Sequence, residues 1–475
     1  MRRYAAAIPP GLLFIALFLF SCAGPVERSI PCGILDADTA DHGLPEIDVM
    51  PEPEETPDED LDGWPEFEND EDAPREPFIV QWGSTANEAG VAVVAAADGA
   101  IYVTGGTTGD IGGNTGLGSS DVFLSKLDPL HEILWTRQWG TSNFDQGLTL
   151  TMGSGGEVYL AGSRDGIVDP FTGAGIGQMF ISRFTKDGAE QWTREWGSLS
   201  QKYQEYPASA TVDHQGDIYV TGWTYGTIGA AGNQGLSDIF LSRFATDGAE
   251  RWSVQWGSGF IDVGYGVVAA GDSGVYVTGW TYGKLDIDRS LFGGNDVFLA
   301  RVNASGGVLW TRQWGSYEED KSFAIAVGPD GGVFLAGQTS GSLGSGLPNN
   351  GLSDNFLVKY SSSGERLWVY QWGTAQNDVA YAVAVDHDGK AYVAGYTEGS
   401  LGGIANKGGK DIFLTAVSAD GAEEWTALYG TPEDEGALSM CFSDGWAVIA
   451  GWTAGTLGEK SAGDHDAVVI YHPVE

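Results

Sequence analysis

Seven acidic residues recur along the chain at intervals of 56 to 60 residues. They are Glu88, Asp145, Glu205, Asp262, Asp320, Asp378 and Asp434. Carboxylates that gather in one place repel each other, and this raises their pKa values unless something compensates. Two roles fit: each carboxylate accepts N–H bonds in a local turn, or a hard cation such as Ca²⁺ binds to some of them. We expect the turn role, because every repeat carries the acid and a single ion needs only a few.

A second recurring position is often aromatic and precedes a long glycine-rich segment. The aromatic residues at or just after it are Trp223, Tyr225, Trp280, Tyr282, Tyr396 and Trp452. Exposed Trp and Tyr side chains stack on sugars or anchor protein partners. The alternative is that these rings pack in the seams between neighbouring repeats.

The histidines form no catalytic or metal-binding pattern. They are His42, His131, His214, His387, His465 and His472, and no HExxH, GxSxG or CxxC segment occurs. Three of them, His131, His214 and His387, fall in predicted hairpins of separate repeats. We therefore predict a protein that is not an enzyme and has no required cofactor. A lyase or hydrolase that uses carboxylates or tyrosines is the less favoured alternative.

These residues belong to a repeat of about 58 residues that starts near residue 77. The tag Gln-Trp-Gly, or a close variant, ends at Gly83, Gly140, Gly197, Gly257, Gly315, Gly373 and Gly430. A Tyr-Val-Thr-Gly-like tag and an Asp-x-Phe tag keep the same interval. A fixed period over a whole domain indicates a repeat architecture.

Each repeat contains four strand-like runs, which in the sixth repeat are 381–385, 391–396, 411–417 and 424–429. They are rich in β-branched and aromatic residues, and Asp-Gly pairs at the tight turns supply the positive φ that hairpins need. Seven such units predict an all-β fold, a seven-bladed β-propeller of four-stranded antiparallel blades.

The last repeat lacks its fourth strand, and residues 78–83 at the other end match residues 135–140. The N-terminal segment is therefore expected to complete blade 7 and close the ring, which removes free sheet edges. Trp135 and Trp139 are four residues apart on a strand and share one face, so we expect them to pack between blades.

The combination Tyr-Val-Thr-Gly, Asp-x-Phe-Leu, Leu-Trp and Gln-Trp-Gly resembles the bacterial SBBP-type β-propeller repeat family over residues 77–475. The resemblance implies a secreted or envelope propeller, often with a lipoprotein signal. It implies no catalytic residue.

Seven long loops join the second and third strands and should share one face with the connections between blades. They span residues 106–120, 163–177, 223–237, 280–295, 338–353, 396–410 and 452–465. Long loops that differ in sequence on a rigid scaffold are typical of binding surfaces.

The N-terminus has the features of an export signal. Arg2 and Arg3 precede an apolar run over residues 12–20, which is too short to span a bilayer. Cys22 follows in a lipobox-like sequence, so residues 1–22 are predicted to be a lipoprotein-type signal peptide with Cys22 as the lipid attachment site. Of the two other cysteines, Cys441 is expected to be a buried free thiol.

Residues 23–76 are predicted to form an acidic, proline-rich, disordered linker, because like charges extend such a segment. The whole chain of 475 residues carries a formal charge of −41. So negative a chain has too few cations to bind nucleic-acid backbones.

Together these features predict a lipid-anchored propeller of a bacterial cell envelope, in the outer membrane or at the cell surface. It would act as a non-catalytic binding or adhesion module whose long-loop face takes a protein or glycan ligand. A purely structural envelope protein is the alternative.

Overall fold

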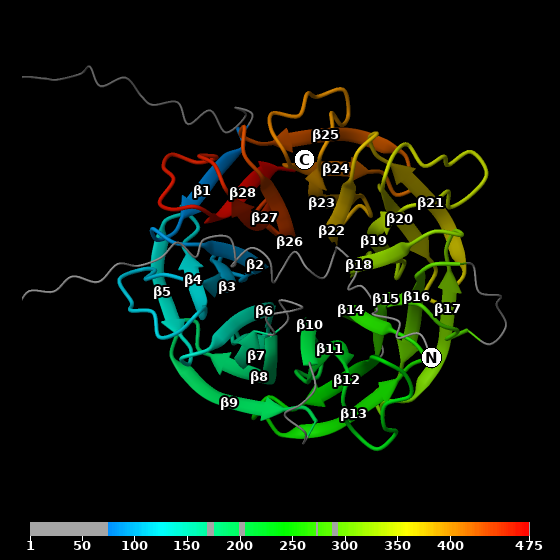
Figure 1. Cartoon of the computed structure of the whole chain (residues 1–475), viewed down its shortest axis with the longest axis horizontal. Coiled ribbons are helices and arrows are strands. Elements are labelled where there is room, and N and C mark those ends of the chain that lie inside the picture. The colour runs from blue at the N-terminus through cyan, green and yellow to red at the C-terminus, as the bar shows by residue number, and fades with distance from the viewer. Residues whose placement is uncertain (1–74, 169–174, 199–204, 272–273, 287–292, 475) are drawn as a thin grey trace, which may run out of the picture. The chain divides into compact units, whose positions relative to one another are not determined.

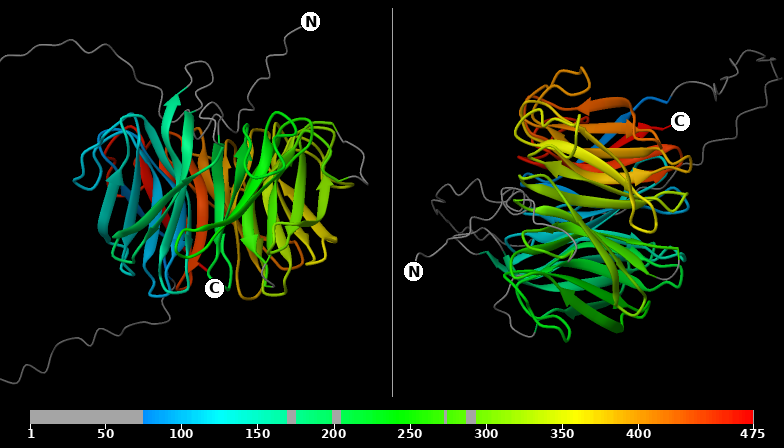
Figure 2. Two further views of the ribbon diagram at one scale, coloured as in Figure 1. Left: turned by 90° about the horizontal axis from the view of Figure 1, so that it is seen from below. Right: turned by 90° about the vertical axis from the view of Figure 1, so that its right-hand side faces the viewer.

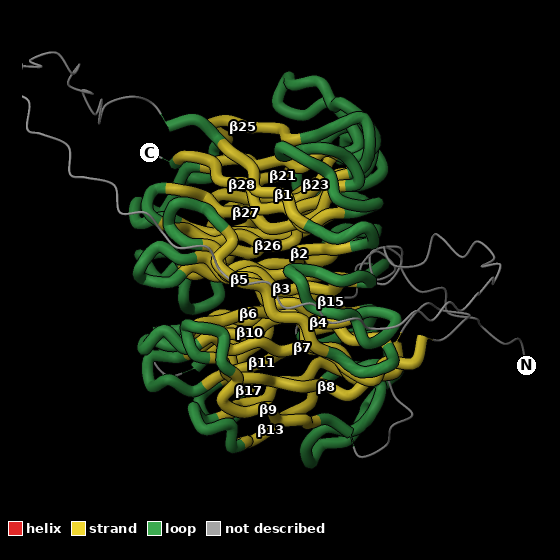
Figure 3. Tube along the Cα trace, turned by 90° about the vertical axis from the view of Figure 1, so that its left-hand side faces the viewer, coloured by secondary structure: helices red, strands yellow, loops and turns green. Residues whose placement is uncertain are grey.

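The computed structural model describes residues 75–168, 175–198, 205–271, 274–286 and 293–474, with residues 165–177 described by backbone alone. The predicted signal peptide, the lipid site Cys22 and all but the last two residues of the predicted linker lie outside these ranges. The described residues form strands, turns and loops without a helix (Figure 3), so none of their elements is a helix that could cross a membrane.

The strands form seven antiparallel four-stranded sheets arranged in a ring, which confirms the predicted seven-bladed propeller (Figure 1). Blade 1 consists of β2 (Glu88–Ala95), β3 (Ile101–Thr107), β4 (Asp121–Leu127) and β5 (Ile133–Trp139). Blade 2 consists of β6 (Phe144–Met152), β7 (Val158–Val168), β8 (Gly175–Phe184) and β9 (Glu190–Trp196). Blade 3 consists of β10 (Glu205–Val212), β11 (Ile218–Thr224), β12 (Asp238–Phe244) and β13 (Glu250–Trp256).

The second half of the ring repeats the same order. Blade 4 consists of β14 (Asp262–Ala269), β15 (Val275–Thr281), β16 (Asp296–Val302) and β17 (Val308–Trp314). Blade 5 consists of β18 (Asp320–Val327), β19 (Val333–Thr339), β20 (Asp354–Tyr360) and β21 (Arg366–Trp372). Blade 6 consists of β22 (Asp378–Val385), β23 (Ala391–Thr397), β24 (Asp411–Val417) and β25 (Glu423–Tyr429).

Blade 7 combines the two ends of the propeller. It consists of β26 (Glu435–Ser443), β27 (Trp446–Thr453), β28 (Asp466–Pro473) and β1 (Phe78–Trp82). Strand β1 pairs with β28 from Phe78↔Tyr471 to Trp82↔Ala467, and Figure 1 shows the first and last strands side by side. The predicted closure by residues 78–83 is therefore confirmed.

The first strand of each blade lies nearest the centre of the ring, and the fourth lies outermost (Figure 1). In the sixth repeat the first strand begins at Asp378, three residues earlier than the sequence suggested. The reason is a β-bulge at Tyr381, where the ladder skips one residue between Ala380 and Ala382 and then continues. A bulge breaks the alternation on which a strand assignment depends.

The second and third strands are almost entirely buried, because each blade packs both faces against its neighbours. One core cluster, for example, joins Val448 and Val469 of blade 7 to Val103 and Phe123 of blade 1. Burying apolar surface of this kind is the main stabilising contribution to the fold.

The fourth strands of blades 1 to 5 each pack against the next hairpin through a tryptophan. Trp192 donates its indole N–H to the Thr246 carbonyl at 3.2 Å, and its ring lies against Gly248. Gly248 has a φ of +82°, and an added Cβ would lie 3.0 Å from the indole. The equivalent Trp135 lies against Gly188, and Trp139 contacts Phe184 of blade 2, so the predicted packing of both tryptophans between blades is confirmed.

Blade 2 departs from the predicted loop over residues 163–177. There β7 and β8 continue as a paired hairpin, with Ile167↔Ile176 and Val168↔Gly175 in register, and extend beyond the other blades (Figure 2). β-branched residues favour extended pairing, and this overrides the loop tendency of the surrounding glycines.

Candidate functional site

The seven predicted acidic positions lie at the start of the first strands, on the long-loop face, and we call them the acidic ring. Six of the seven predicted residues occupy this position, and each is less than 5% exposed: Glu88, Asp145, Glu205, Asp262, Asp320 and Asp378. In blade 7 the prediction is wrong by one residue, because Glu435 takes the place assigned to Asp434. The hairpin of blade 7 has only Asp444 and Gly445 between its strands. An acid position that is assigned by its distance from the hairpin glycine therefore falls one residue too early in this blade.

The ring carboxylates bind their own turns. Asp378 accepts hydrogen bonds from the Thr374 N–H at 2.5 Å, the Thr374 hydroxyl at 2.9 Å and the Thr397 hydroxyl at 2.5 Å. Glu435 accepts the same three kinds of bond from Thr431 and Thr453. This is the local turn role that short acidic side chains often fill. In the described ranges, no group of three or more His, Cys, Asp or Glu side chains is arranged to hold a metal ion.

A second carboxylate faces the ring from the preceding blade. These are the Asp-x-Phe acids, such as Asp296 before Asp320. Gly315 of the Gln-Trp-Gly tag lies between the two, and a Cβ there would be 2.6 Å from Asp296 Oδ1 and 2.6 Å from Asp320 Oδ2. Glycine is therefore required at this seam, because a side chain would collide with both carboxylates.

Burial raises the pKa of several acids in this region. It raises the pKa of Asp320 to about 6, and the neighbouring Asp296 carboxylate adds to the rise. Burial also raises the pKa of Asp262 and Asp378, although hydrogen bonds from nearby Ser and Thr residues oppose it. Desolvation disfavours the charged form, so these carboxyls hold protons to a higher pH than free aspartic acid.

The six aromatic residues predicted at the start of the long loops, which we call the aromatic rim, divide into buried and more exposed members. Trp223, Trp280, Tyr396 and Trp452 are each at most 8% exposed. Trp223 and Trp280 pack with Val263 in one apolar cluster, which is the seam packing given above as the alternative. Tyr225 is half-buried, and Tyr282 is 51% exposed.

The first strands carry aromatic residues that sequence reasoning missed. Tyr265, Phe323 and Tyr381 are the bulge residues of β14, β18 and β22, each three residues after a ring carboxylate. This constant offset was the available signal. It was overlooked because the bulge places these residues outside the alternation of the strand.

These side chains join two rim residues in a continuous series of ring contacts, which we call the aromatic belt. Its members are Tyr206, Trp223, Tyr265, Phe323, Tyr381 and Tyr396, and the consecutive ring centroids are 4.9, 6.1, 5.0, 5.0 and 6.1 Å apart. Tyr265 of blade 4 touches blade 3 and blade 5 at once. A side chain inside a seam reaches only one neighbouring blade, so the belt runs along the inner edge, where the blades meet the central channel.

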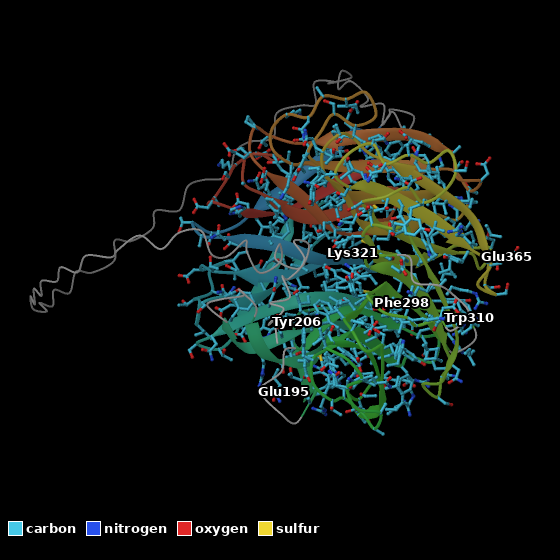
Figure 4. The ribbon with its side chains drawn as sticks, turned by 45° about the vertical axis from the view of Figure 1, so that its right-hand side comes forward. Glu195, Tyr206, Phe298, Trp310, Lys321 and Glu365 are labelled. Atoms are coloured by element: carbon cyan, nitrogen blue, oxygen red, sulfur yellow. The ribbon has the colours of Figure 1, made fainter. Side chains whose placement is uncertain are left out.

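The belt covers one side of the channel only. It spans blades 3 to 6, whereas the bulge residues of blades 7, 1 and 2 are Leu438, Val91 and Leu148. Figure 4 shows Tyr206 near the middle of the ring together with Lys321, and Trp310 and Glu365 at its periphery.

An exposed apolar patch lies beside the belt on the long-loop face. It consists of Leu236, Phe260 and Tyr282, which are 54%, 50% and 51% exposed. The rings of Phe260 and Tyr282 meet edge-on with centroids 5.9 Å apart, and the Leu236 N–H donates to the Phe260 carbonyl. The next residue, Ile261, packs against the Trp223 cluster, so patch and belt are contiguous.

The histidines of the described ranges either lie away from the long-loop face or make contacts that hold neighbouring blades together. His465 Nδ1 is 2.8 Å from Asn87 Oδ1 across the seam between blades 7 and 1, and His472 Nδ1 is 2.5 Å from the Tyr429 hydroxyl. Burial lowers the pKa of both histidines. Cys441 is a free thiol whose pKa burial raises to about 12, so it is a poor nucleophile.

Comparison with known proteins supports the fold and leaves the activity open. No family model matches the chain. It is 32% identical to the regulatory protein FlaEY of Caulobacter vibrioides over 184 residues, which cover 36% of this chain and 19% of that protein. It is 21% identical to the uncharacterized WD repeat-containing protein L264 of Acanthamoeba polyphaga mimivirus, with 59% of this chain and 27% of that protein covered. The chain thus spans about a quarter or less of the length of these relatives.

Solved propellers resemble the chain in fold at low sequence identity. A polysaccharide lyase of family PL25, an ulvan lyase bound to a GlcA–Rha3S unit, is 13% identical with a TM-score of 0.50, covering 83% of this chain and 96% of that chain. The WD40 domain of Neurospora crassa Pan2 is 10% identical with a TM-score of 0.44, covering 82% and 90%. At this level of identity the likeness shows only that the chain is a repeat protein with a β-propeller fold.

Proposed function

We propose that this propeller is a non-catalytic binding module that takes its ligand on the long-loop face. The observation that carries this proposal is the exposed patch of Leu236, Phe260 and Tyr282, which is contiguous with the aromatic belt. Exposed aromatic and aliphatic residues grouped on one face are typical of interaction sites. The buried ring acids beneath it are engaged in turn hydrogen bonds and supply no free acid–base pair.

The proposal includes export and anchoring in a bacterial envelope. It rests on the sequence features of residues 1–22, on Cys22 as the lipid site and on the resemblance to SBBP-type propellers. A lipid anchor followed by an extended acidic linker would hold the propeller away from the membrane while leaving its long-loop face accessible. The ligand would be a protein or glycan of the same envelope or of a neighbouring cell.

Protease treatment of intact cells tests the location. Rapid loss of the propeller from cells whose periplasmic proteins stay intact is expected, and full protection would contradict surface display.

Binding is tested with the full chain, purified in a neutral detergent and presented to a glycan array and to purified envelope proteins. The double variant F260S/Y282S should lose whatever the wild type binds. The matched control is Leu130→Ser, an exposed leucine in the hairpin between β4 and β5 at the other face. Equal binding by all three proteins would place the site elsewhere.

A further inference from the structure

Three segments of the chain meet at the exposed patch of Leu236, Phe260 and Tyr282. The Leu236 N–H donates to the Phe260 carbonyl at 2.9 Å, and a Cβ added to Gly235 would lie 2.4 Å from that carbonyl oxygen. A Cβ added to Gly283 would lie 3.2 Å from the Phe260 ring. The end of one long loop, the connection between blades 3 and 4 and the start of the next long loop are therefore packed together. The patch is thus already ordered before a ligand arrives, which reduces the entropic cost of binding.

The two rings of the patch are open to a ligand. Phe260 and Tyr282 are 50% and 51% exposed, and their ring planes meet at 61°. Two rings at this angle form a corner that is comparable in size to one six-membered sugar ring. The C–H groups of a sugar are slightly positive and pack against the negative face of an aromatic ring.

A side-chain amide lies next to the patch. Gln234 is exposed, and in the described part of the chain its side chain has no hydrogen-bond partner. Its own N–H donates to the Asp238 carboxylate at 2.8 Å, and the next residue, Gly235, lies against the Phe260 carbonyl. An amide both donates and accepts hydrogen bonds, so it can pair with a sugar hydroxyl in either direction. Ligand sites commonly combine aromatic and apolar walls with a few such polar groups.

The segments that form the patch carry no charge. Residues 225–237, 257–261 and 281–283 contain no Asp, Glu, Lys, Arg or His, although the whole chain has 65 acidic and 24 basic residues. Beyond them the long-loop face carries Lys284 and, in the next connection between blades, Glu318, which are exposed and opposite in sign. The patch therefore has no net local charge to attract an ion, and the net charge of −41 repels anions.

From these observations we infer that the patch binds an uncharged sugar unit of a glycan. The sugar would pack its C–H groups against Phe260 and Tyr282, and its remaining apolar surface would contact Leu236. Its hydroxyl groups would exchange hydrogen bonds with the Gln234 amide. The inference rests on the proposed function and narrows the ligand from a protein or glycan to a neutral glycan. A protein partner would use the same apolar residues without needing flat rings, and the test depends on this difference.

Saturation-transfer NMR measures binding to the full chain in a neutral detergent that has no sugar headgroup. The neutral probes are cellotetraose, maltotetraose, mannotetraose and chitotetraose, and the charged comparison is tetragalacturonate. At least one neutral tetrasaccharide should bind, about fivefold or more tightly than tetragalacturonate. Absence of transfer to all four neutral sugars would overturn the inference, and so would equal binding of tetragalacturonate.

Leucine variants separate ring stacking from general apolar contact. Phe260→Leu and Tyr282→Leu keep an apolar side chain but lose the ring, and each should weaken sugar binding about fivefold or more. Tyr282→Phe keeps the ring and should stay within about twofold of the wild type. Gln234→Leu removes only the amide and should also weaken binding. The matched control is Tyr317→Leu, an 82% exposed tyrosine in the next connection between blades, which should bind like the wild type.

The outcomes distinguish failure of the inference from failure of the proposed function. Sugar binding that survives in both leucine variants would overturn the inference. A purified envelope protein that binds both leucine variants but not F260S/Y282S would support the docking face and contradict the glycan. Neutral sugars that bind F260S/Y282S as well as the wild type would contradict both. If a leucine variant fails to fold, as judged by circular dichroism, Gln234→Leu and tetragalacturonate still decide the matter.

Discussion

The ring of Phe78 contacts the imidazole of His131, with centroids 4.0 Å apart and ring planes tilted by 44°. This contact closes the propeller, because Phe78 belongs to blade 7 and His131 to the β4–β5 hairpin of blade 1. At the seams from blade 1 through blade 6, a tryptophan such as Trp192 lies against a glycine of positive φ. At the closing seam the pair is phenylalanine and histidine, and His131 adopts the glycine-like φ of 71° itself.

The first prediction concerns this closing contact. His131→Ala should destabilise the fold, since it removes the imidazole that contacts Phe78 and Tyr471 and keeps an unfavourable φ. His131→Gly also loses the ring but relieves the backbone, and should be about 1 kcal/mol more stable than the alanine variant. Chemical denaturation of both variants measures the difference. Identical unfolding free energies would show that the backbone at His131 is unstrained.

The second prediction concerns the seam glycines. Gly315→Ala should lower the free energy of unfolding by about 2 to 3 kcal/mol, because its Cβ would collide with two carboxylates. Gly259→Ala is the matched control in the preceding inter-blade connection, where an added Cβ meets nothing within 4 Å. It should change stability by less than about 0.5 kcal/mol. A Gly315→Ala variant as stable as this control would refute the close approach of the carboxylates.

The third prediction concerns pH. The pKa of Asp320 rises from 3.8 to about 6 on folding, so between these values the folded state binds more protons than the unfolded state. Its contribution to stability is therefore complete below pH 3.8 and lost as the pH rises through 6, a difference of about 3 kcal/mol at most. Wild type should gain more stability than Asp320→Asn between pH 7 and pH 4.5.

This comparison cancels the opposite contribution of the histidines. Burial lowers the pKa of His131, His465 and His472, so their contribution is lost as the pH falls below the unfolded value of 6.5. The three histidines are present in wild type and in Asp320→Asn alike, so their contribution drops out of the difference between the two pH profiles. Parallel pH profiles of wild type and Asp320→Asn would mean that Asp320 ionises normally in the folded state.

The fourth prediction concerns the rim aromatics. Trp223→Ala and Trp280→Ala should each cost about 3 to 5 kcal/mol of stability, as expected for a buried tryptophan. Tyr282→Ala should cost less than about 1 kcal/mol, because half of its side chain already faces solvent. Melting temperatures of the three variants suffice, and a tolerated Trp223→Ala would argue that this ring is available for binding.

The fifth prediction concerns the ring carboxylates and calcium. Each of Asp378 and Glu435 already accepts three hydrogen bonds from its own blade, so we expect no cation at the ring. The melting temperature should be the same in excess chelator and in millimolar calcium. An upward shift with calcium would reveal a bound ion by mass action.

The blades, their number and their closure could be predicted from the sequence, because each depends on a local pattern repeated seven times. The prediction of the acid position was wrong only in blade 7, where the turn that contains the hairpin glycine Gly445 is shorter. The belt could not be predicted in the same way. It depends on bulges at Tyr265, Phe323 and Tyr381, and on three successive blades bringing these rings into contact.

The pairing of β1 with β28 has a consequence for how the chain is made. Phe78 and Tyr471 are partners although nearly the whole propeller separates them along the chain, so β1 stays unpaired until the last strand has been synthesised. At 5 to 20 residues per second, that wait is about 20 to 80 s. An unpaired edge strand is prone to join other chains during such an interval. Ring closure is therefore expected to be the last and slowest event in folding, and chaperones that shield β1 should raise the yield of this protein more than that of a propeller closed within one hairpin.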